Sequence, residues 1–151
     1  MVPLKERIAV ETSVLVAALT KGHPHHVPAA NFLNRTLGSA ESQIVISAHC
    51  LAEVFSVLTR APAPMYLSAV EAWQIIQASL LPYVEIESLS GEEYREILAD
   101  CGQHGWSGGK VYDLVHLRSA RKARCTGLYT FNLKHFKNLA SDDWVEQIVS
   151  P

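Results

Sequence analysis

The chain has 151 residues, of which 48% are hydrophobic and 19% are charged, and its formal net charge is −2. These values are typical of a folded globular chain with one core and exclude a highly charged disordered protein. No apolar run approaches the roughly 20 residues of a membrane-spanning helix. Glu11 follows Val10 directly, so the start of the chain lacks a secretory signal pattern. We therefore expect one cytoplasmic domain over residues 1–151, with no membrane partner.

Short apolar runs alternate with longer helical segments. Strands are predicted at 7–10, 43–46, 83–86 and 127–130, with 145–149 as a candidate fifth. Helices are predicted at 14–19, 28–37, 48–60, 69–80, 91–103 and 110–124. This alternation predicts a three-layer α/β/α fold with a central parallel sheet of four to five strands.

Capping residues mark the helix starts. Thr12 or Ser13 is expected to cap the first helix, and Ser47 the third. Ser68–Glu71 and Ser90–Glu93 have the spacing of capping boxes.

Three carboxylates and one amide follow strands or begin helices. Glu11 ends the first apolar run, Asn132 follows the fourth, and Glu53 and Asp113 lie early in helices. The carboxyl ends of parallel strands and the adjoining helix starts share one rim, where ligands bind. Clustered carboxylates repel one another unless a cation joins them, and Mg²⁺ or Mn²⁺ prefers oxygen ligands. The sequence thus predicts Glu11, Glu53 and Asp113 as metal ligands in a catalytic site that Asn132 assists.

Hydroxyl groups and a histidine accompany these acids. Thr12, Ser13 and Thr130 are predicted to orient the carboxylates by hydrogen bonding. His116 lies one helical turn after Asp113 and is predicted to edge the site. The alternative is that the hydroxyls are ordinary caps or strand residues and His116 is a core histidine.

The four site residues also have structural alternatives. Glu11 and Asp113 would each be favourable near a helix N-terminus, where the helix dipole stabilises negative charge. Glu53 would face outward from its helix, and Asn132 would begin the turn after the fourth strand.

The charge is unevenly distributed. Residues 110–137 contain seven basic residues and one acidic residue, a net charge of +6; the remainder has six basic and fourteen acidic residues, a net charge of −8. Such a basic segment indicates contact with nucleic acid, and the alternative is a solvated helix face. The predicted phosphate contacts are Arg118, Arg121, Lys122 and Lys134.

Four segments resemble the motifs of the PIN domain family, and they occur in the family's order. They are Val10–Leu19, Ser47–Leu58, Gly108–His116 and Tyr129–Phe136. Within that family the chain is similar to the VapC-like ribonuclease toxins of toxin–antitoxin pairs. The resemblance implies Mg²⁺- or Mn²⁺-dependent cleavage of RNA, frequent homodimers and inhibition by an antitoxin protein.

The chain departs from the family pattern at two positions. The family usually has aspartate where this chain has Glu11, and many members have aspartate where it has Asn132. The extra methylene of Glu11 moves its carboxylate by about 1 Å, more than a catalytic site tolerates without readjustment. One hypothesis is a metal-dependent endoribonuclease in which Glu11→Asp raises cleavage at least about tenfold. The other is a catalytically weak PIN-like module that binds RNA or a partner protein.

Overall fold

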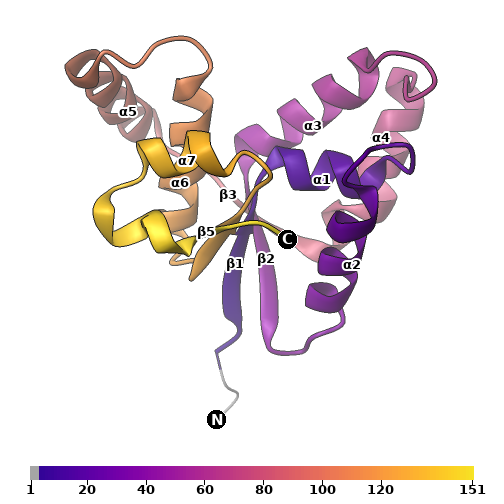
Figure 1. The fold of residues 1–151 in the computed structure, drawn as a ribbon. Helices are drawn as coiled ribbons and strands as arrows, with labels where there is room; N and C mark the ends of the chain where they lie inside the picture. The colour runs from indigo at the N-terminus through magenta and orange to yellow at the C-terminus, as the bar shows by residue number, and fades with distance from the viewer. Residues whose placement is uncertain (1–3) are drawn as a thin grey trace.

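The structure is a computed structural model, and it describes residues 4–151. Within these residues, five strands alternate with helical segments that comprise seven α-helices and two short 3₁₀ helices (Figure 1). The strands are β1 Glu6–Val10, β2 Ser42–Ser47, β3 Val84–Glu87, β4 Gly127–Tyr129 and β5 Ile148–Val149. The α-helices are α1 Thr12–Leu19, α2 His26–Leu37, α3 Ala48–Arg60, α4 Ala69–Ser79, α5 Gly91–His104, α6 Lys110–Lys122 and α7 Leu133–Leu139. The 3₁₀ helices are η1 Leu81–Tyr83 and η2 Asp142–Gln147.

All four strand pairings are parallel, and the strand order is β3-β2-β1-β4-β5. The central strand β1 pairs on both sides, with Ile8 opposite Ile44 of β2 and Gly127 of β4. The predicted α/β fold with a parallel sheet is therefore confirmed. The order reverses on the two sides of β1, and open sheets of this kind bind ligands beyond the strand ends at that point.

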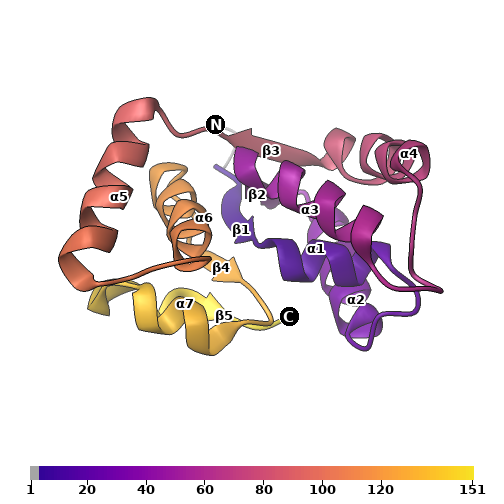
Figure 2. The same ribbon diagram turned by 90° about the horizontal axis from the view of Figure 1, so that it is seen from above.

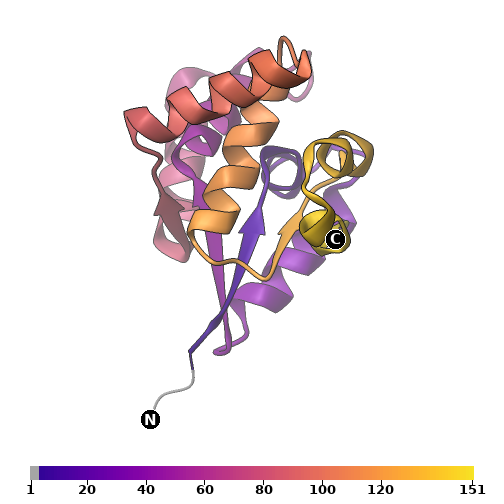
Figure 3. The same cartoon turned by 90° about the vertical axis from the view of Figure 1, so that its left-hand side faces the viewer.

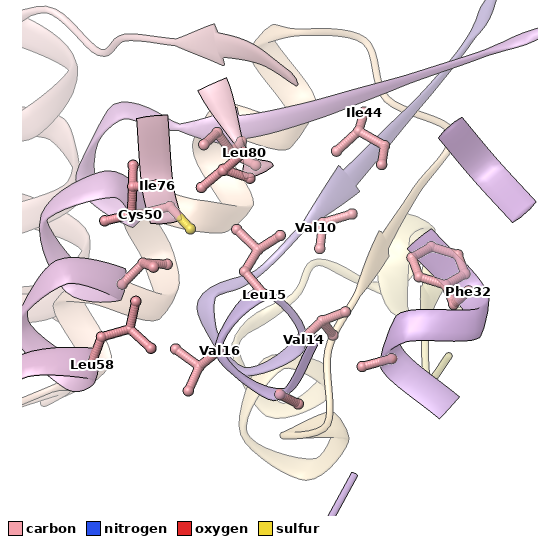
Figure 4. Packing of buried hydrophobic residues seen from close by; sticks show 14 of the residues in the cluster. Val10, Val14, Leu15, Val16, Phe32, Ile44, Cys50, Leu58, Ile76 and Leu80 are labelled. Atoms are coloured by element: carbon pink, nitrogen blue, oxygen red, sulfur yellow. The ribbon is translucent and has the colours of Figure 1, made fainter. Parts of the chain in front are cut away.

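Side chains of the sheet alternate between two apolar cores, as the two-residue period of a strand requires. Ile8 and Val10 of β1 join the core under α1–α4, whereas Ala9 joins the core under α6 and α7. Figure 4 shows the first core, in which Leu15 and Phe32 meet the sheet. The helix α5 packs on α6, and Figure 3 views the molecule from the side of these two helices. Helices thus cover both faces of the sheet.

Local capping signals mark the starts of three α-helices, α3, α4 and α5. Ser47 accepts a hydrogen bond from the Cys50 backbone N–H, and the capping boxes at Ser68–Glu71 and Ser90–Glu93 are both formed. The predicted cap at Thr12 or Ser13 is wrong, because α1 begins one residue after Glu11, which occupies the cap position. Both hydroxyl residues lie inside the first turn instead.

The C-terminal region differs most from the predicted elements. The short helix α7 was not predicted, since its seven residues follow β4 after only a brief turn. The candidate fifth strand at 145–149 is mainly the 3₁₀ helix η2, and only Ile148 and Val149 pair with β4. No helix within residues 4–151 combines the length and apolar character needed to cross a membrane.

Candidate functional site

The predicted site residues gather where the strands end and the helices begin. Glu11 directly follows β1, and Thr130 directly follows β4. Glu53 lies in the second turn of α3, and Asp113 in the first turn of α6. Figure 2 looks down on this rim, where the starts of α1, α3 and α6 lie around the end of the sheet. The topology therefore places four residues that are far apart in sequence on one edge.

Glu11 is held from two directions by hydroxyl groups. Its backbone N–H donates to the Tyr129 carbonyl over 3.0 Å, which ties the end of β1 to β4. Its Oε2 accepts from Ser13 Oγ at 2.6 Å and from Thr130 Oγ1 at 2.8 Å. The residue is only 5% exposed, and Thr130 is fully buried. A buried carboxylate needs such donors, because desolvation of an unpaired charge is costly.

Backbone donors fix these two hydroxyls in turn. The Asn132 N–H donates to Thr130 Oγ1 over 2.9 Å, and the Phe131 N–H donates to Ser13 Oγ over 3.1 Å. Each hydroxyl accepts from the main chain and points its own proton toward Glu11. The turn after β4 therefore determines where the Glu11 carboxylate lies.

Glu53 is held by a second, separate network. Its Oε1 accepts from Thr12 Oγ1 at 2.9 Å and lies 2.5 Å from Nε2 of His116. His116 is 3% exposed, and its Nδ1 lies 2.8 Å from Ser47 Oγ. An ionised carboxylate only accepts hydrogen bonds, so we assign the imidazole proton of His116 to Nε2, which donates it to Glu53. Nδ1 of His116 then accepts a hydrogen bond from the Ser47 hydroxyl. Ser47 thereby sets the tautomer that His116 presents to Glu53.

The pKa of Glu53 reflects this network. Burial raises it, but the hydrogen bond from His116 and the electrostatic attraction of that ring outweigh burial, with a further contribution from Thr12, so the pKa lies below its usual value. His49 adds a weaker contact, with Nε2 3.7 Å from Glu53 Oε1. Glu53 is thus kept ionised near neutral pH.

Asp113 contrasts with the two glutamates. Its side chain forms no hydrogen bond within the part of the chain that the structure describes, residues 4–151. The pKa of Asp113 is raised to about 6, mainly by burial and then by the negative charges of Glu11 and, less strongly, Glu53, while His116 and His135 lower it. The three carboxylates therefore lie close enough to interact electrostatically.

A pocket of about 490 Å³ opens at this place. Glu53 and Asp113 line it, whereas Glu11 does not. The other lining residues are Trp106, Ser107, Gly109, Lys110, Tyr112, His135, Asn138 and Leu139.

Two glycines shape the loop that leads into the wall of this pocket. Gly105 and Gly108 have positive φ angles of 67° and 62°. Such angles suit glycine because a Cβ atom strains them.

The donor chemistry fits a hard divalent cation. Oε1 of Glu11, Oε2 of Glu53 and both oxygens of Asp113 accept no hydrogen bond from residues 4–151. Such oxygens are the ligands that Mg²⁺ and Mn²⁺ prefer. Within the same residues, however, no group of three or more His, Cys, Asp or Glu side chains is arranged so that it could hold a metal ion. The donors suit the ion, and the carboxylates would have to turn toward one another to enclose it.

Asn132 and His116 differ from their expected positions. Asn132 precedes α7 with an exposed side chain that makes no hydrogen bond to the described residues, so only its backbone joins the network. His116 is buried, as the alternative of a core histidine described, and it contacts Glu53; its role at the site stays a prediction. Thr12, Ser13 and Thr130 make the carboxylate contacts that orienting residues require, and their catalytic role stays a prediction.

The basic residues of α6 have partners inside the molecule. Their ion pairs are Arg118 with Glu96 at 2.6 Å, Arg121 with Asp143 at 3.4 Å, and Lys122 with Glu93 at 2.8 Å. Lys134 is exposed and forms no ion pair with residues 4–151. Contact of these four side chains with RNA stays a prediction, and Lys134 is the most available of them.

Several residues at the site were not predicted. Ser47 was identified as a helix cap, but its contact with His116 spans 69 positions and leaves no local signal. His49 lies four residues before Glu53 on the same helix, a spacing that places the two side chains on one face. Lys110, Tyr112 and His135 lie within the segments that resemble the family motifs but were not identified as site residues, and they line the pocket.

Comparison with known proteins gives consistent matches. A family model described as PIN domain matches residues 8–141. The chain is 30% identical over 118 residues to Ribonuclease VapC27 of Mycobacterium tuberculosis (strain ATCC 25618 / H37Rv), covering 78% of this chain and 80% of that one. It is 33% identical over 110 residues to Ribonuclease VapC40 of Mycobacterium tuberculosis (strain CDC 1551 / Oshkosh), covering 72% and 74%.

Two solved structures share the fold at low sequence identity. VapC20 of Mycobacterium tuberculosis, described as a Sarcin-Ricin loop cleaving toxin, superposes with a TM-score of 0.62 at 21% identity, covering 83% of this chain and 89% of that one. VapBC2 of Rickettsia felis, bound to a DNA fragment from their promoter, gives a TM-score of 0.66 at 20% identity, covering 96% and 98%.

Proposed function

Because this chain belongs to the PIN domain family and has VapC ribonucleases among its relatives, we propose that it is a metal-dependent endoribonuclease that hydrolyses RNA phosphodiesters. One observation carries this proposal. Asp113 has no hydrogen-bond partner among residues 4–151 and its pKa is raised by the charges of Glu11 and Glu53. Three carboxylates that interact in this way favour a cation as their missing partner.

Glu11, Glu53 and Asp113 would hold Mg²⁺ or Mn²⁺ through their oxygens that accept no hydrogen bond. Such an ion, when bound, lowers the pKa of a water for attack on the phosphate and offsets the charge of the leaving oxygen. Ser13 and Thr130 orient Glu11, and Thr12 and His116 orient Glu53.

The exposed amide of Asn132 is proposed to assist at the edge of this site, by contact with substrate or water. Positive charge would bind the RNA backbone. Lys110 lines the pocket, and Lys134 is exposed on α7, so both are available to phosphates. Arg118, Arg121 and Lys122 would have to exchange their internal partners for phosphate groups. This exchange costs little, because exposed ion pairs contribute only about 0–1 kcal/mol.

The proposed biological role is the toxin component of a toxin–antitoxin pair, with an antitoxin protein as partner and a homodimer as the assembly. The names of the relatives support this role. Light scattering on the purified chain tests the dimer. Growth arrest on expression, relieved by a co-expressed antitoxin, tests the role.

Cleavage of RNA by the purified protein tests the activity. We expect cleavage with Mn²⁺, none with excess chelator, and at least about 100-fold less in Asp113→Asn, since a metal ligand matters more than the surrounding shell. Asp142→Asn is the matched control, because Asp142 is an exposed aspartate on η2 outside the pocket. Equal cleavage by both variants would exclude the assigned site.

One observation favours a second function, a weakly catalytic module that binds RNA or a partner protein. Glu11 already has one oxygen occupied by two hydroxyls, and no three site residues within 4–151 are arranged to hold an ion. RNA binding without Mn²⁺-dependent cleavage would support this second function over the first.

A further inference from the structure

We propose that the pocket beside Asp113 is a nucleobase subsite, in which an unpaired base of single-stranded RNA packs against Trp106 and Tyr112. The proposal rests on the proposed function, because it takes RNA as the ligand of this site. It adds recognition of the base next to the cleaved phosphate, which the three carboxylates of the site cannot provide.

The size of the pocket indicates more than an ion. Six waters of about 30 Å³ each, a full shell for Mg²⁺, occupy roughly 180 Å³. The pocket measures about 490 Å³, within the range of roughly 300–1,000 Å³ that small organic ligands occupy. Glu53 and Asp113 account for only part of its wall. The remaining space is large enough for a base and its ribose.

Two aromatic side chains supply stacking surfaces. His104 stacks on Trp106, with ring centroids 4.3 Å apart and planes inclined by 11°. His49 stacks on Tyr112 in the same manner, at 4.7 Å and 13°. Each histidine covers one face of its partner. Tyr112 is 48% exposed, Trp106 also packs against the apolar clusters beside α5 and α6, and both rings line the pocket, where a ligand can contact them. Single-stranded RNA is bound in this way, since every base has a flat face that aromatic rings can stack upon.

Polar groups with no partner within residues 4–151 lie around these rings. The side chains of Ser107, His135 and Asn138 line the pocket and form no hydrogen bond to those residues. An amide offers both a donor and an acceptor, which suits the edge of a base. Lys110 also lines the pocket, forms no ion pair within the described residues, and is placed to bind a phosphate. The pocket therefore combines stacking, edge-reading and charge beside the proposed catalytic carboxylates.

The test measures binding of short single-stranded RNA by fluorescence anisotropy, in an Asp113→Asn background that prevents cleavage. Trp106→Leu should weaken binding by about fivefold to 150-fold, the range that loss of one base–aromatic stack produces. Trp106→Phe should restore most of the affinity. Trp73→Leu is the matched control, because Trp73 is 49% exposed on α4 and does not line the pocket. Thermal melting checks that each variant is folded.

A second variant, at Asn138, tests the subsite without disturbing the packing of Trp106. Asn138 is exposed, so Asn138→Ala should fold normally and should reduce the difference in Kd among U, C, A and G homopolymers. Unchanged base preference in Asn138→Ala, or equal affinities of Trp106→Leu and Trp73→Leu, would overturn the subsite, as would absence of RNA binding.

These failures are distinguishable from failure of the nuclease proposal. Mn²⁺-dependent cleavage by the unmodified protein together with equal affinities of the two tryptophan variants leaves the nuclease and removes the subsite. Binding that depends on Trp106, with no cleavage, leaves the subsite and removes the nuclease.

Discussion

The two ends of α6 use charge in opposite ways. Near its start, Asp113 faces Glu11 and Glu53 with no ion-pair partner among residues 4–151. One to three turns later, Arg118 and Lys122 meet acids of α5 and β3, with the closest contacts at 2.6 and 2.8 Å. At the acidic end Glu53 has His116 and His49 beside it, but Glu11 and Asp113 form no ion pair with residues 4–151, whereas the basic end is neutralised by its neighbours. Uncompensated charge is costly to a fold, so it indicates a binding or catalytic site.

The ion pairs at the basic end change what the charge of residues 110–137 implies about RNA binding. Residues 110–137 carry +6 and by composition resemble a nucleic-acid surface. In the fold, three of the basic side chains are occupied by acids from other segments. A charge excess along the sequence is therefore not the same as a charge excess on the surface.

The largest expected effect concerns metal binding at the acidic end. Mn²⁺ should raise the melting temperature of the unmodified protein, because a ligand that binds only the folded state stabilises it. Asp113→Asn should abolish this shift, and Asp142→Asn should keep it. Differential scanning calorimetry with and without millimolar Mn²⁺ measures both. A shift that persists in Asp113→Asn would place the ion elsewhere.

The next effect concerns His116 as a positioning residue for Glu53. Ser47→Ala removes the hydroxyl that sets the His116 tautomer, and His116→Gln removes the ring. Each should weaken Mn²⁺ affinity by about 10- to 100-fold, as changes to groups that orient metal ligands do. Nitrogen NMR of the imidazole should show protonated Nε2 in the unmodified protein and a mixture of tautomers in Ser47→Ala. A single unchanged tautomer would contradict the assigned role.

Glu11→Asp should give a smaller effect, and the contacts of Glu11 lead us to expect the opposite of the sequence-based prediction, which stays untested. Aspartate withdraws the carboxylate by about 1 Å, away from two hydroxyls that now lie at 2.6 and 2.8 Å. Loss of these contacts in a buried place should cost about 1–3 kcal/mol of stability. We expect a lower melting temperature and reduced cleavage at fixed Mn²⁺. Increased cleavage with unchanged melting would show that the site prefers aspartate.

The stability of the metal-free protein should also depend on Asp113 and pH. Its pKa of about 6 in the folded state exceeds the ordinary 3.8, so between these values the folded state binds more protons than the unfolded state. Stability should therefore fall as pH rises from about 4 to 6, by about 1–3 kcal/mol in total. The stability of Asp113→Asn should not fall in this way, because asparagine does not titrate. Urea unfolding of both proteins at pH 4 and pH 7 measures the difference, and parallel pH profiles would contradict it.

The smallest effects belong to the basic end. Lys122→Ala should lower stability only slightly, because its ion pairs are exposed to solvent. Lys134→Ala should leave stability unchanged but weaken RNA binding more than Lys122→Ala does, since Lys134 has no ion pair among the described residues. The salt dependence of RNA affinity should decrease only for Lys134→Ala. Equal decreases for both variants would show that phosphate displaces the internal partners.

Local sequence patterns predicted most of the fold because the features that specify its strands and helices involve residues close together in the sequence. Apolar runs, the Ser68–Glu71 capping box and the Ser47 cap each depend on residues within one turn. The short helix α7 was missed, and the candidate fifth strand at 145–149 was predicted too long, because packing against β4 and α6 stabilises this region in a way that composition does not reveal.

The site was predictable only in part. Residues that follow strands, such as Glu11, could be placed on the rim from topology alone. The Ser47–His116–Glu53 network could not, because its contacts join positions 63 and 69 residues apart. The pocket was also hidden, since Trp106 and Asn138 come from separate segments that only the fold brings together.

Calorimetric titration of Mn²⁺ tests the central claim, that Glu11, Glu53 and Asp113 form a cation site. It should be run at pH 6 in two buffers with different ionisation enthalpies, so that protons released on binding are counted. We expect saturable binding with net proton release, as the ion displaces the proton from Asp113, and no such binding by Asp113→Asn. Absence of saturable binding up to millimolar Mn²⁺, or identical binding by Asp113→Asn, would contradict the account.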